Sequence, residues 1–332
     1  MKLIRMSQLL AKPLPPGNLE LLHKSVTMLK SVFFHGKTAR IHHLWNSGAI
    51  KPVIYNGCHH SADSYSLPEN VRLKFSKFSG GSVDLTKDEQ SGIAQITLNQ
   101  PQHKNAFSGK MMLDLFDAIN ELENWKSGKG LLMAGAANTF CSGGDLKVVT
   151  NLTDSGEEMS SMMQNALTKL SRLPLISVAL IEGVALGGGA ELTTACDFRI
   201  MAPKAKIGFV QVHMGVISGW GGGTRLVKLI GHTSALDLFS TGKIINSSTA
   251  LAFGLVDHVV EDGENAMEAA KEWLSKRCRG HSSVTRSIKS MVSHAGTEDV
   301  QSSLNHERKL FSKLWGGPLF LEALRKNIKH KS

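Results

Sequence analysis

The chain has 332 residues, of which 42% are hydrophobic, and a formal net charge of +10. It is long enough to bury a full core as one large or two ordinary domains. Its most apolar stretch, residues 174–190, contains Glu182 and four glycines and is shorter than the roughly 18 apolar residues of a membrane span, so we exclude a transmembrane segment. The four cysteines are far apart and form no CxxC pair, which argues against a disulfide framework and favours a reducing compartment.

The positive charge would suit a nucleic acid or an anionic small molecule. The sequence has no long Lys/Arg run and no interleaved aromatic residues of the kind that single-strand binders use. A phosphate-bearing small molecule therefore stays open as a ligand.

The first 70 residues differ in composition from the rest. They carry eight Lys or Arg against three acids, which contributes half of the net charge, and six of the fourteen histidines. Such a segment is either a disordered extension or a mitochondrial transit peptide. The pairs His42-His43 and His59-His60 have no Cys or carboxylate at ligand spacing, so we interpret them as solvated side chains rather than metal ligands.

From residue 81 onward, strands and helices alternate. The alternation of residues 82–86 and 92–98 around a polar stretch predicts a hairpin, and Ser108 is expected to cap a helix that runs to residue 125. The next predicted elements are a short buried strand, a helix that ends before Pro174 and a central strand, at residues 130–133, about 157–173 and 175–181. Beyond these, helices at 234–240 and 247–253, a strand at 255–260 and a helical last 70 residues are expected.

Two glycine-rich runs stand out: FCSGGD at residues 140–145, the first glycine run, and LGGGAE at residues 186–191, the second. We expect the strand at 175–181 to lead directly into the second run and then into a helix at 190–195. A strand, a glycine turn and a helix start form an anion-binding arrangement, because the first N–H groups of a helix have no internal partner. Tight packing of helix on sheet is the alternative explanation for three consecutive glycines. No P-loop and no dinucleotide fingerprint is present.

Three motifs occur in a fixed order, FCSGGDL, IEGVALGGGAELTTACDFRI and GVISGWGGGTRL. With them, the chain from residue 81 onward resembles the crotonase (enoyl-CoA hydratase/isomerase) superfamily. The resemblance implies an α/β fold of the ClpP/crotonase type, a spiral of ββα repeats with C-terminal helices that form a trimer or a dimer of trimers. The domains expected on this basis are an N-terminal extension (1–70), the spiral core (71–270) and a C-terminal helical region (271–332).

Within the superfamily, the segments NAFS (105–108), LENW (122–125), PLISVAL (174–180) and WGGP (315–318) resemble a branch of carboxy-lyases that act on ethylmalonyl-CoA. This resemblance implies decarboxylation of ethylmalonyl-CoA to butyryl-CoA, with slower conversion of methylmalonyl-CoA to propionyl-CoA. It also implies a cytosolic enzyme that removes wrongly carboxylated thioesters. A mitochondrial location is the alternative if the basic N-terminus is a transit peptide.

Carried over by motif position, the resemblance makes the N–H groups of Gly144 and Gly188 the oxyanion donors for a thioester carbonyl, with Glu191 close by. Hydratases of the superfamily present a second glutamate, but that position holds Gln211, which cannot exchange a proton at neutral pH. Decarboxylation needs no base to begin, and so it is favoured. Glu191 is expected to protonate the enolate, which would require a raised pKa, or else to orient its neighbours.

Gln211 is also assigned to substrate binding, together with Phe140 and Trp220, which either line an apolar pocket or simply pack in the core. His103, Lys104 and Ser142 match positions where the superfamily lines its coenzyme A cleft. The basic tail at 325–331 is a further candidate for phosphate contacts or serves solubility. No cofactor beyond the CoA moiety of the substrate, no metal, no nucleic acid and no membrane is expected.

Two alternatives stay open. One is a hydratase or isomerase that uses Glu191 with water. The other is an RNA-binding crotonase relative, for which the sequence pI near 9.4 is the support.

Overall fold

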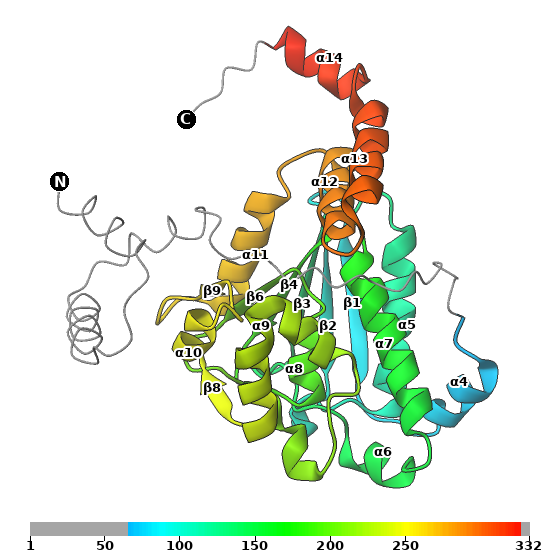
Figure 1. The fold of residues 1–332 in the computed structure, drawn as a ribbon, viewed down its shortest axis with the longest axis vertical. Coiled ribbons are helices and arrows are strands. Elements are labelled where there is room, and N and C mark those ends of the chain that lie inside the picture. Colours follow the sequence, from blue (N-terminus) through cyan, green and yellow to red (C-terminus); the bar gives the residue numbers. More distant parts are fainter. Residues whose placement is uncertain (1–65, 327–332) are drawn as a thin grey trace, which may run out of the picture. The chain divides into compact units, whose positions relative to one another are not determined.

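The computed structural model describes residues 66–326, and its elements are labelled in Figure 1. Most of the predicted N-terminal extension, both histidine pairs and most of the basic C-terminal tail lie outside the described residues. The domain boundaries at residues 70 and 270 therefore stay predictions.

A six-stranded sheet in the order β1-β2-β3-β4-β6-β9 forms the centre of the described chain (Figure 1). The hairpin of β1 (Ser82–Asp88) and β2 (Ile93–Asn99) pairs antiparallel from Ser82 against Asn99 to Asp88 against Ile93. All later neighbours in this sheet are parallel: β3 (Gly130–Gly135), β4 (Ile176–Ile181), β6 (Phe198–Met201) and β9 (His258–Val259). The predicted hairpin and central strand are confirmed.

Both faces of the sheet are buried because helices cover each of them. Leu131 and Met133 of β3 belong to the cluster that includes α5 (Gly109–Asn124) and α7 (Gly156–Arg172). Leu132 and Ala134 point the other way and pack with α11 (Ala266–Arg277). The predicted cap of α5 is confirmed, since the Ser108 side chain accepts a hydrogen bond from the Met111 N–H.

A second, three-stranded sheet corrects the sequence prediction around the second glycine run. It consists of β5 (Val184–Leu186), β7 (Lys206–Gly208) and β8 (Ile244–Asn246). β4 ends at Ile181, and a turn at Gly183 with φ of +55° breaks the chain before β5 begins. The glycines therefore follow β5 rather than β4, and α8 (Gly188–Thr193) begins inside the glycine triplet, two residues earlier than predicted.

The strand predicted at 255–260 was too long, because only His258–Val259 pairs as β9. The residues before it have other partners. The N–H groups of Leu255 and Val256 donate to the Ala250 carbonyl at the end of α10 (Ser247–Ala252), and the Leu255 carbonyl accepts from Arg199. Leu255 and Val256 therefore do not extend β9.

Five further elements were not predicted or differ in extent. They are α4 (Glu69–Ser76), η1 (Pro101–His103), α6 (Leu146–Asn151), η2 (Val210–Met214) and α9 (Gly222–Thr241), which is broken at Gly231. α9 contains the helix expected at 234–240. No helix within residues 66–326 is both long and apolar enough to cross a bilayer.

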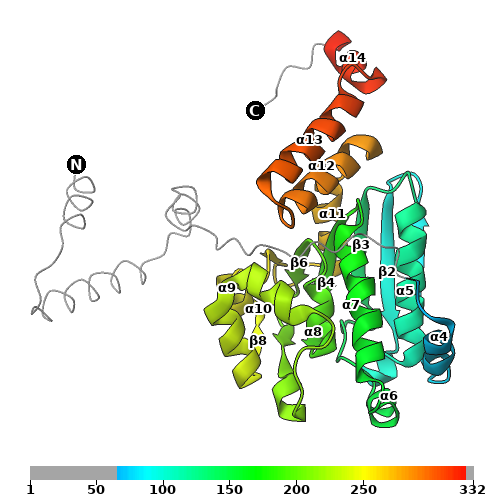
Figure 2. The same cartoon turned by 45° about the vertical axis from the view of Figure 1, so that its right-hand side comes forward.

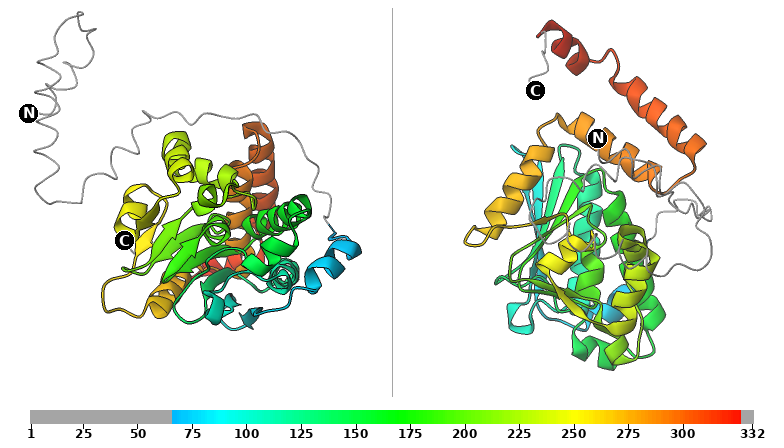
Figure 3. Two further views of the ribbon diagram at one scale, coloured as in Figure 1. Left: turned by 90° about the horizontal axis from the view of Figure 1, so that it is seen from below. Right: turned by 60° about the vertical axis from the view of Figure 1, so that its left-hand side comes forward.

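The last part of the described chain is helical, as predicted. α12 (Ser282–Ala295) and α13 (Val300–Leu314) lie side by side, and α14 (Pro318–Arg325) follows, as the views in Figure 2 and Figure 3 show. Large apolar side chains on α13 and α14, such as Leu304, Phe311 and Leu324, are exposed. The trimer that the resemblance implies stays a prediction.

A buried lysine joins α12 to the main sheet. Lys289, only 6% exposed, forms an ion pair with Asp197 and donates to the Ser171 carbonyl at 3.0 Å. The same aspartate accepts from the N–H and hydroxyl of Ser177 on β4, at 2.8 and 2.9 Å. The pair therefore links α12, the end of α7 and β4.

Lys289→Met should lower the free energy of unfolding by about 2–3 kcal/mol, because it leaves the partly buried Asp197 carboxylate without its cation. Urea denaturation at neutral pH measures this. The matched control is Lys276→Met, which breaks an exposed pair with Glu272 on α11 and should cost less than about 1 kcal/mol. Equal losses in the two variants would contradict the assigned role of Lys289.

Candidate active site

The two glycine runs lie against each other in the structure. Cys141 forms a parallel bridge with Ala185, and the Leu186 N–H donates to the Cys141 carbonyl at 2.9 Å. A Cβ atom on Gly143 would lie 3.5 Å from the Gly188 amide nitrogen. Residues 44 or 45 positions apart in the sequence are thus in contact.

Gly144 is held by contacts on both of its sides. The Phe107 N–H donates to the Gly143 carbonyl at 2.8 Å, and the Asp145 N–H donates to the Phe107 carbonyl at 2.9 Å. The side chain of Asp145 then caps α6 by accepting from the Lys147 N–H. This pairing fixes the peptide that carries the Gly144 N–H.

The amide groups of Gly144 and Gly188 are free to bind a ligand. Within residues 66–326, neither N–H donates a hydrogen bond to another group of the protein. For Gly188 this follows from its place as the first residue of α8, where an N–H has no intrahelical acceptor. Two fixed donors in neighbouring segments are what an oxyanion hole requires.

Trp220 lies directly against Gly188. A Cβ atom on Gly188 would be 2.7 Å from the indole ring, so only glycine fits there. The ring also meets Phe107 edge to face, with centroids 5.6 Å apart. Trp220 and Phe140 are 4% and 0% exposed and belong to the core, which accounts for both residues, while their predicted contact with substrate stays a prediction.

Glu191, three residues after Gly188, is 2% exposed and accepts five hydrogen bonds. Three of them reach Oε2: the Trp220 and Gly222 N–H groups, each at 2.8 Å, and the Ser218 hydroxyl at 2.5 Å. A Cβ atom on Gly222 would lie 2.4 Å from Cγ of Glu191, so glycine is needed for this approach. The carboxylate therefore holds residues 218–223, which we call the Glu191 loop.

The other oxygen of Glu191 faces Gln211. Gln211 donates from Nε2 to Oε1 at 2.8 Å, and the Gly219 N–H reaches the same oxygen at 3.3 Å. Gln211 lies on η2, just after β7. The structure thus brings together the predicted site residues Gly144, Gly188, Glu191 and Gln211.

Arg225 was not among the predicted site residues, but it supports the Glu191 loop through the Trp220 carbonyl. Its guanidinium donates to the Trp220 carbonyl at 2.6 Å and to the Thr194 hydroxyl at 3.0 Å. Burial lowers the pKa of Arg225, and the Glu191 carboxylate opposes this by raising it. The run GWGGGTR marked this segment, but spacing alone does not show that its N–H groups point at Glu191.

The three residues predicted to contact coenzyme A also lie together. Ser142 donates from its hydroxyl to the His103 carbonyl at 3.2 Å and from its N–H to the Lys104 carbonyl at 3.0 Å. His103 and Lys104 are exposed, and His103 Nδ1 lies 3.4 Å from an Asp145 carboxylate oxygen. Their role in binding CoA stays a prediction.

The first glycine run also contains a cysteine. Burial raises the pKa of the Cys141 thiol to about 12, so the thiol is not a nucleophile at neutral pH. Its sulfur accepts from the Gly143 N–H at 3.3 Å. Cys141 therefore helps to hold the backbone of the first glycine run in place.

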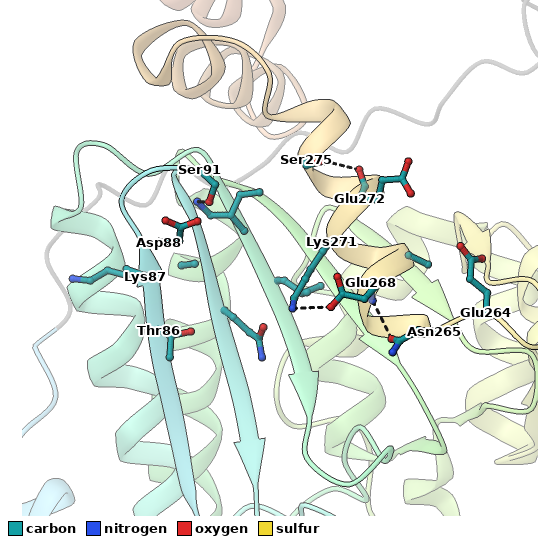
Figure 4. A pocket seen from close by; sticks show the side chains of 15 residues that line it. Thr86, Lys87, Asp88, Ser91, Glu264, Asn265, Glu268, Lys271, Glu272 and Ser275 are labelled. Atoms are coloured by element: carbon teal, nitrogen blue, oxygen red, sulfur yellow. Dashed lines mark hydrogen bonds and ion pairs between the residues drawn. The ribbon is translucent and has the colours of Figure 1, made fainter.

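A separate groove of about 670 Å³ lies between the β1–β2 hairpin and α11 (Figure 4). Two of its charged side chains, Glu268 and Lys271, form an ion pair at 3.1 Å. The groove contains none of the predicted site residues, and we locate the candidate site at the two free N–H groups instead. Within residues 66–326, no cluster of His, Cys, Asp or Glu is arranged to hold a metal ion.

Similarity to known proteins assigns the chain to a family. The sequence profile described as "Enoyl-CoA hydratase/isomerase" matches residues 88–317. The chain belongs to the enoyl-CoA hydratase/isomerase family. The crotonase fold inferred from the three ordered motifs is thereby confirmed.

Family members with solved structures share this fold. An enoyl-CoA hydratase from Bacillus anthracis superimposes with a TM-score of 0.68 at 29% identity, over 75% of this chain and 97% of its own. A Thermobifida fusca protein, solved in complex with acetoacetyl-CoA, gives a TM-score of 0.64 at 25% identity, over 72% of this chain and 96% of its own.

Relatives within the family are more similar still and share one name, ethylmalonyl-CoA decarboxylase. The protein from Mus musculus is 49% identical over 79% of this chain and 82% of its own. The protein from Homo sapiens is 44% identical over 91% of this chain and 96% of its own. The resemblance to this branch of the family is thereby confirmed.

Glu191→Gln should lower the free energy of unfolding by about 2–3 kcal/mol, because an NH₂ group would then face N–H donors that now have an acceptor. Chemical denaturation at pH 7 measures the loss. The control is Glu264→Gln at an exposed position, which should stay within about 0.5 kcal/mol of wild type. A Glu191→Gln protein as stable as wild type would contradict the network of five donors.

Proposed function

We propose that this protein decarboxylates ethylmalonyl-CoA to butyryl-CoA. The observation that carries the proposal is the pair of free N–H groups at Gly144 and Gly188, with Gln211 where a second acid would be expected. The name shared by the similar relatives supports the same reaction.

The reaction needs little more than this pair of donors. Loss of CO₂ breaks the bond between the α-carbon and the carboxylate, and the electron pair moves into the thioester carbonyl to form an enolate. Hydrogen bonds from Gly144 and Gly188 strengthen as negative charge grows on the oxygen, so they stabilise the transition state more than the ground state.

The contacts of Glu191 weigh against hydration. Adding water to an enoyl thioester requires groups that exchange protons with that water. Both oxygens of Glu191 already accept hydrogen bonds, and the Gln211 amide cannot exchange a proton at neutral pH.

The same contacts support the orienting role for Glu191 over the proton-donor role. A carboxyl group that donated a proton would need an oxygen facing an acceptor, but each oxygen faces donors. In our proposal, Glu191 holds the Glu191 loop and thereby keeps Trp220 against Gly188. The proton for the enolate then comes from elsewhere.

The remaining parts of the proposal concern substrate and setting. The complex of the Thermobifida fusca protein with acetoacetyl-CoA supports a CoA thioester as the ligand, and His103, Lys104 and Ser142 would line the CoA cleft. Methylmalonyl-CoA lacks one CH₂, worth about 0.8 kcal/mol when buried, so it should react about fourfold less efficiently. A cytosolic repair role and a trimer complete the proposal.

Purified protein should release CO₂ from ethylmalonyl-CoA and leave crotonyl-CoA largely unchanged. Trapping of ¹⁴CO₂ from carboxyl-labelled substrate measures the first reaction, and loss of the enoyl absorbance measures the second. Hydration of crotonyl-CoA without CO₂ release from ethylmalonyl-CoA would refute the proposed function.

Gly188→Ala should slow decarboxylation by about 100-fold or more, because the added methyl group meets the Trp220 ring and displaces one of the two donors. Steady-state kinetics with ethylmalonyl-CoA measure this. Gly156→Ala, at the start of α7 with no atom within 4 Å of the new methyl group, is the control and should keep wild-type activity. Similar rates in both variants would contradict the role of the Gly188 N–H.

A further inference from the structure

The contact between α12 and α13 is shallow. The two helices lie side by side (Figure 2), and in the part of the chain that the structure describes no side chain of α13 is fully buried. The buried side chains of α12 are those of Thr285 and Lys289, and Lys289 is directed toward the main sheet, where it pairs with Asp197. The attachment of α13 therefore depends on partly exposed side chains, which makes it a candidate for local opening.

Two histidines stack at this contact. The imidazole rings of His294 on α12 and His306 on α13 lie with their centroids 4.2 Å apart and their planes 6° from parallel. Both residues are half-buried. A hydroxyl group of the opposite helix lies beside each ring: Ser290 Oγ is 2.9 Å from His306 Nε2, and Ser303 Oγ is 3.4 Å from His294 Nδ1. Both histidines thus join the two helices.

The stack is compatible with one charged ring but not with two. Flat rings in contact attract each other, whereas two imidazolium charges at this separation repel. Burial lowers the pKa of His306, and the positive charges of His294, Lys309 and Lys313 lower it further. The burial and the neighbouring His294 are both lost when α13 leaves α12. Protonation of His306 is therefore less favourable while the two helices are in contact.

The acidic residues around the stack have other positions or partners. Glu298 and Glu307 are exposed, and Asp299 caps the N-terminus of α13. On the side of α12 that faces α7 and β4, the charged groups are Lys289 and its partner Asp197. The charges that act on His306 come instead from the other ring and the two lysines of α13, so each of them opposes a second positive charge.

We propose that the stack of His294 on His306 is a pH-sensitive contact that holds α13 on α12 at neutral pH and releases it in acid. The direction follows from proton binding, because the separated helices bind more protons than the helices in contact, so a falling pH favours release. The contact keeps its full strength above the ordinary histidine pKa of about 6.5 and weakens as the pH falls from there. This inference is independent of the proposed decarboxylation.

Hydrogen–deuterium exchange of the full-length protein, read on peptides within residues 300–314, tests this. If His306 takes up one proton on release, the exchange of α13, corrected for the intrinsic rate at each pH, should speed up about tenfold from pH 7.5 to pH 5.5. His306→Phe keeps a flat ring beside His294 but cannot become charged, so its exchange should change less than about twofold. The matched control is His232→Phe, at an exposed position on α9, which should keep the tenfold response.

Each response is measured within one variant, so a change in baseline stability does not affect it. The core helix α5 is the internal reference for general unfolding in acid, and its corrected exchange should change less than about twofold. No pH response of α13 in wild type, an equal response in His306→Phe, or an equal speed-up in α5 would each overturn the proposal. If His306→Phe does not fold, His306→Gln, which can still bond to Ser290 but does not titrate, must lose the response.

Discussion

The burial of one carboxylate constrains the whole candidate site. Glu191 is 2% exposed, and a charge in that position is tolerated only if hydrogen bonds replace the water it has lost. The replacement donors come from η2 and from the Glu191 loop, 20 to 31 residues further along the chain. Three segments that share no secondary structure are thereby fixed relative to one another.

The position of Gly188 depends on that constraint. The Trp220 backbone N–H donates to Glu191, and the Trp220 ring lies against Gly188, so a residue that hydrogen-bonds the carboxylate also supports the oxyanion donor. Arg225 also stabilises the Glu191 loop, because its guanidinium donates to the Trp220 carbonyl. The amide groups that we propose to bind the thioester oxygen are therefore set before substrate arrives, which is the condition for electrostatic stabilisation of an enolate.

Local pattern predicted much of the fold. The β1–β2 hairpin, the capped helix α5 and the helix before Pro174 follow from periodicity and capping, which involve neighbours in sequence. β5 was missed because three residues carry no period, and β9 was predicted too long because Leu255 and Val256 bond to Ala250 instead of a strand. Such competition between partners is not visible in a sequence.

The candidate site likewise has a part that the sequence predicted and a part that it did not. Its glycines and Glu191 could be named from ordered motifs, and the structure brings them together. The contacts that give Glu191 its role could not be foreseen, because they come from backbone N–H groups that every residue except proline possesses. Likewise, only the folded arrangement shows that Gln211 Oε1 is buried without a hydrogen-bond partner among residues 66–326.

The central claim is that Gly144 and Gly188 together hold a thioester oxygen. A crystal structure of the protein with an ethylmalonyl-CoA analogue that cannot lose CO₂ tests it most directly. The account predicts the thioester oxygen at about 2.7–3.1 Å from both amide nitrogens. A bound analogue whose oxygen contacts neither nitrogen would contradict it.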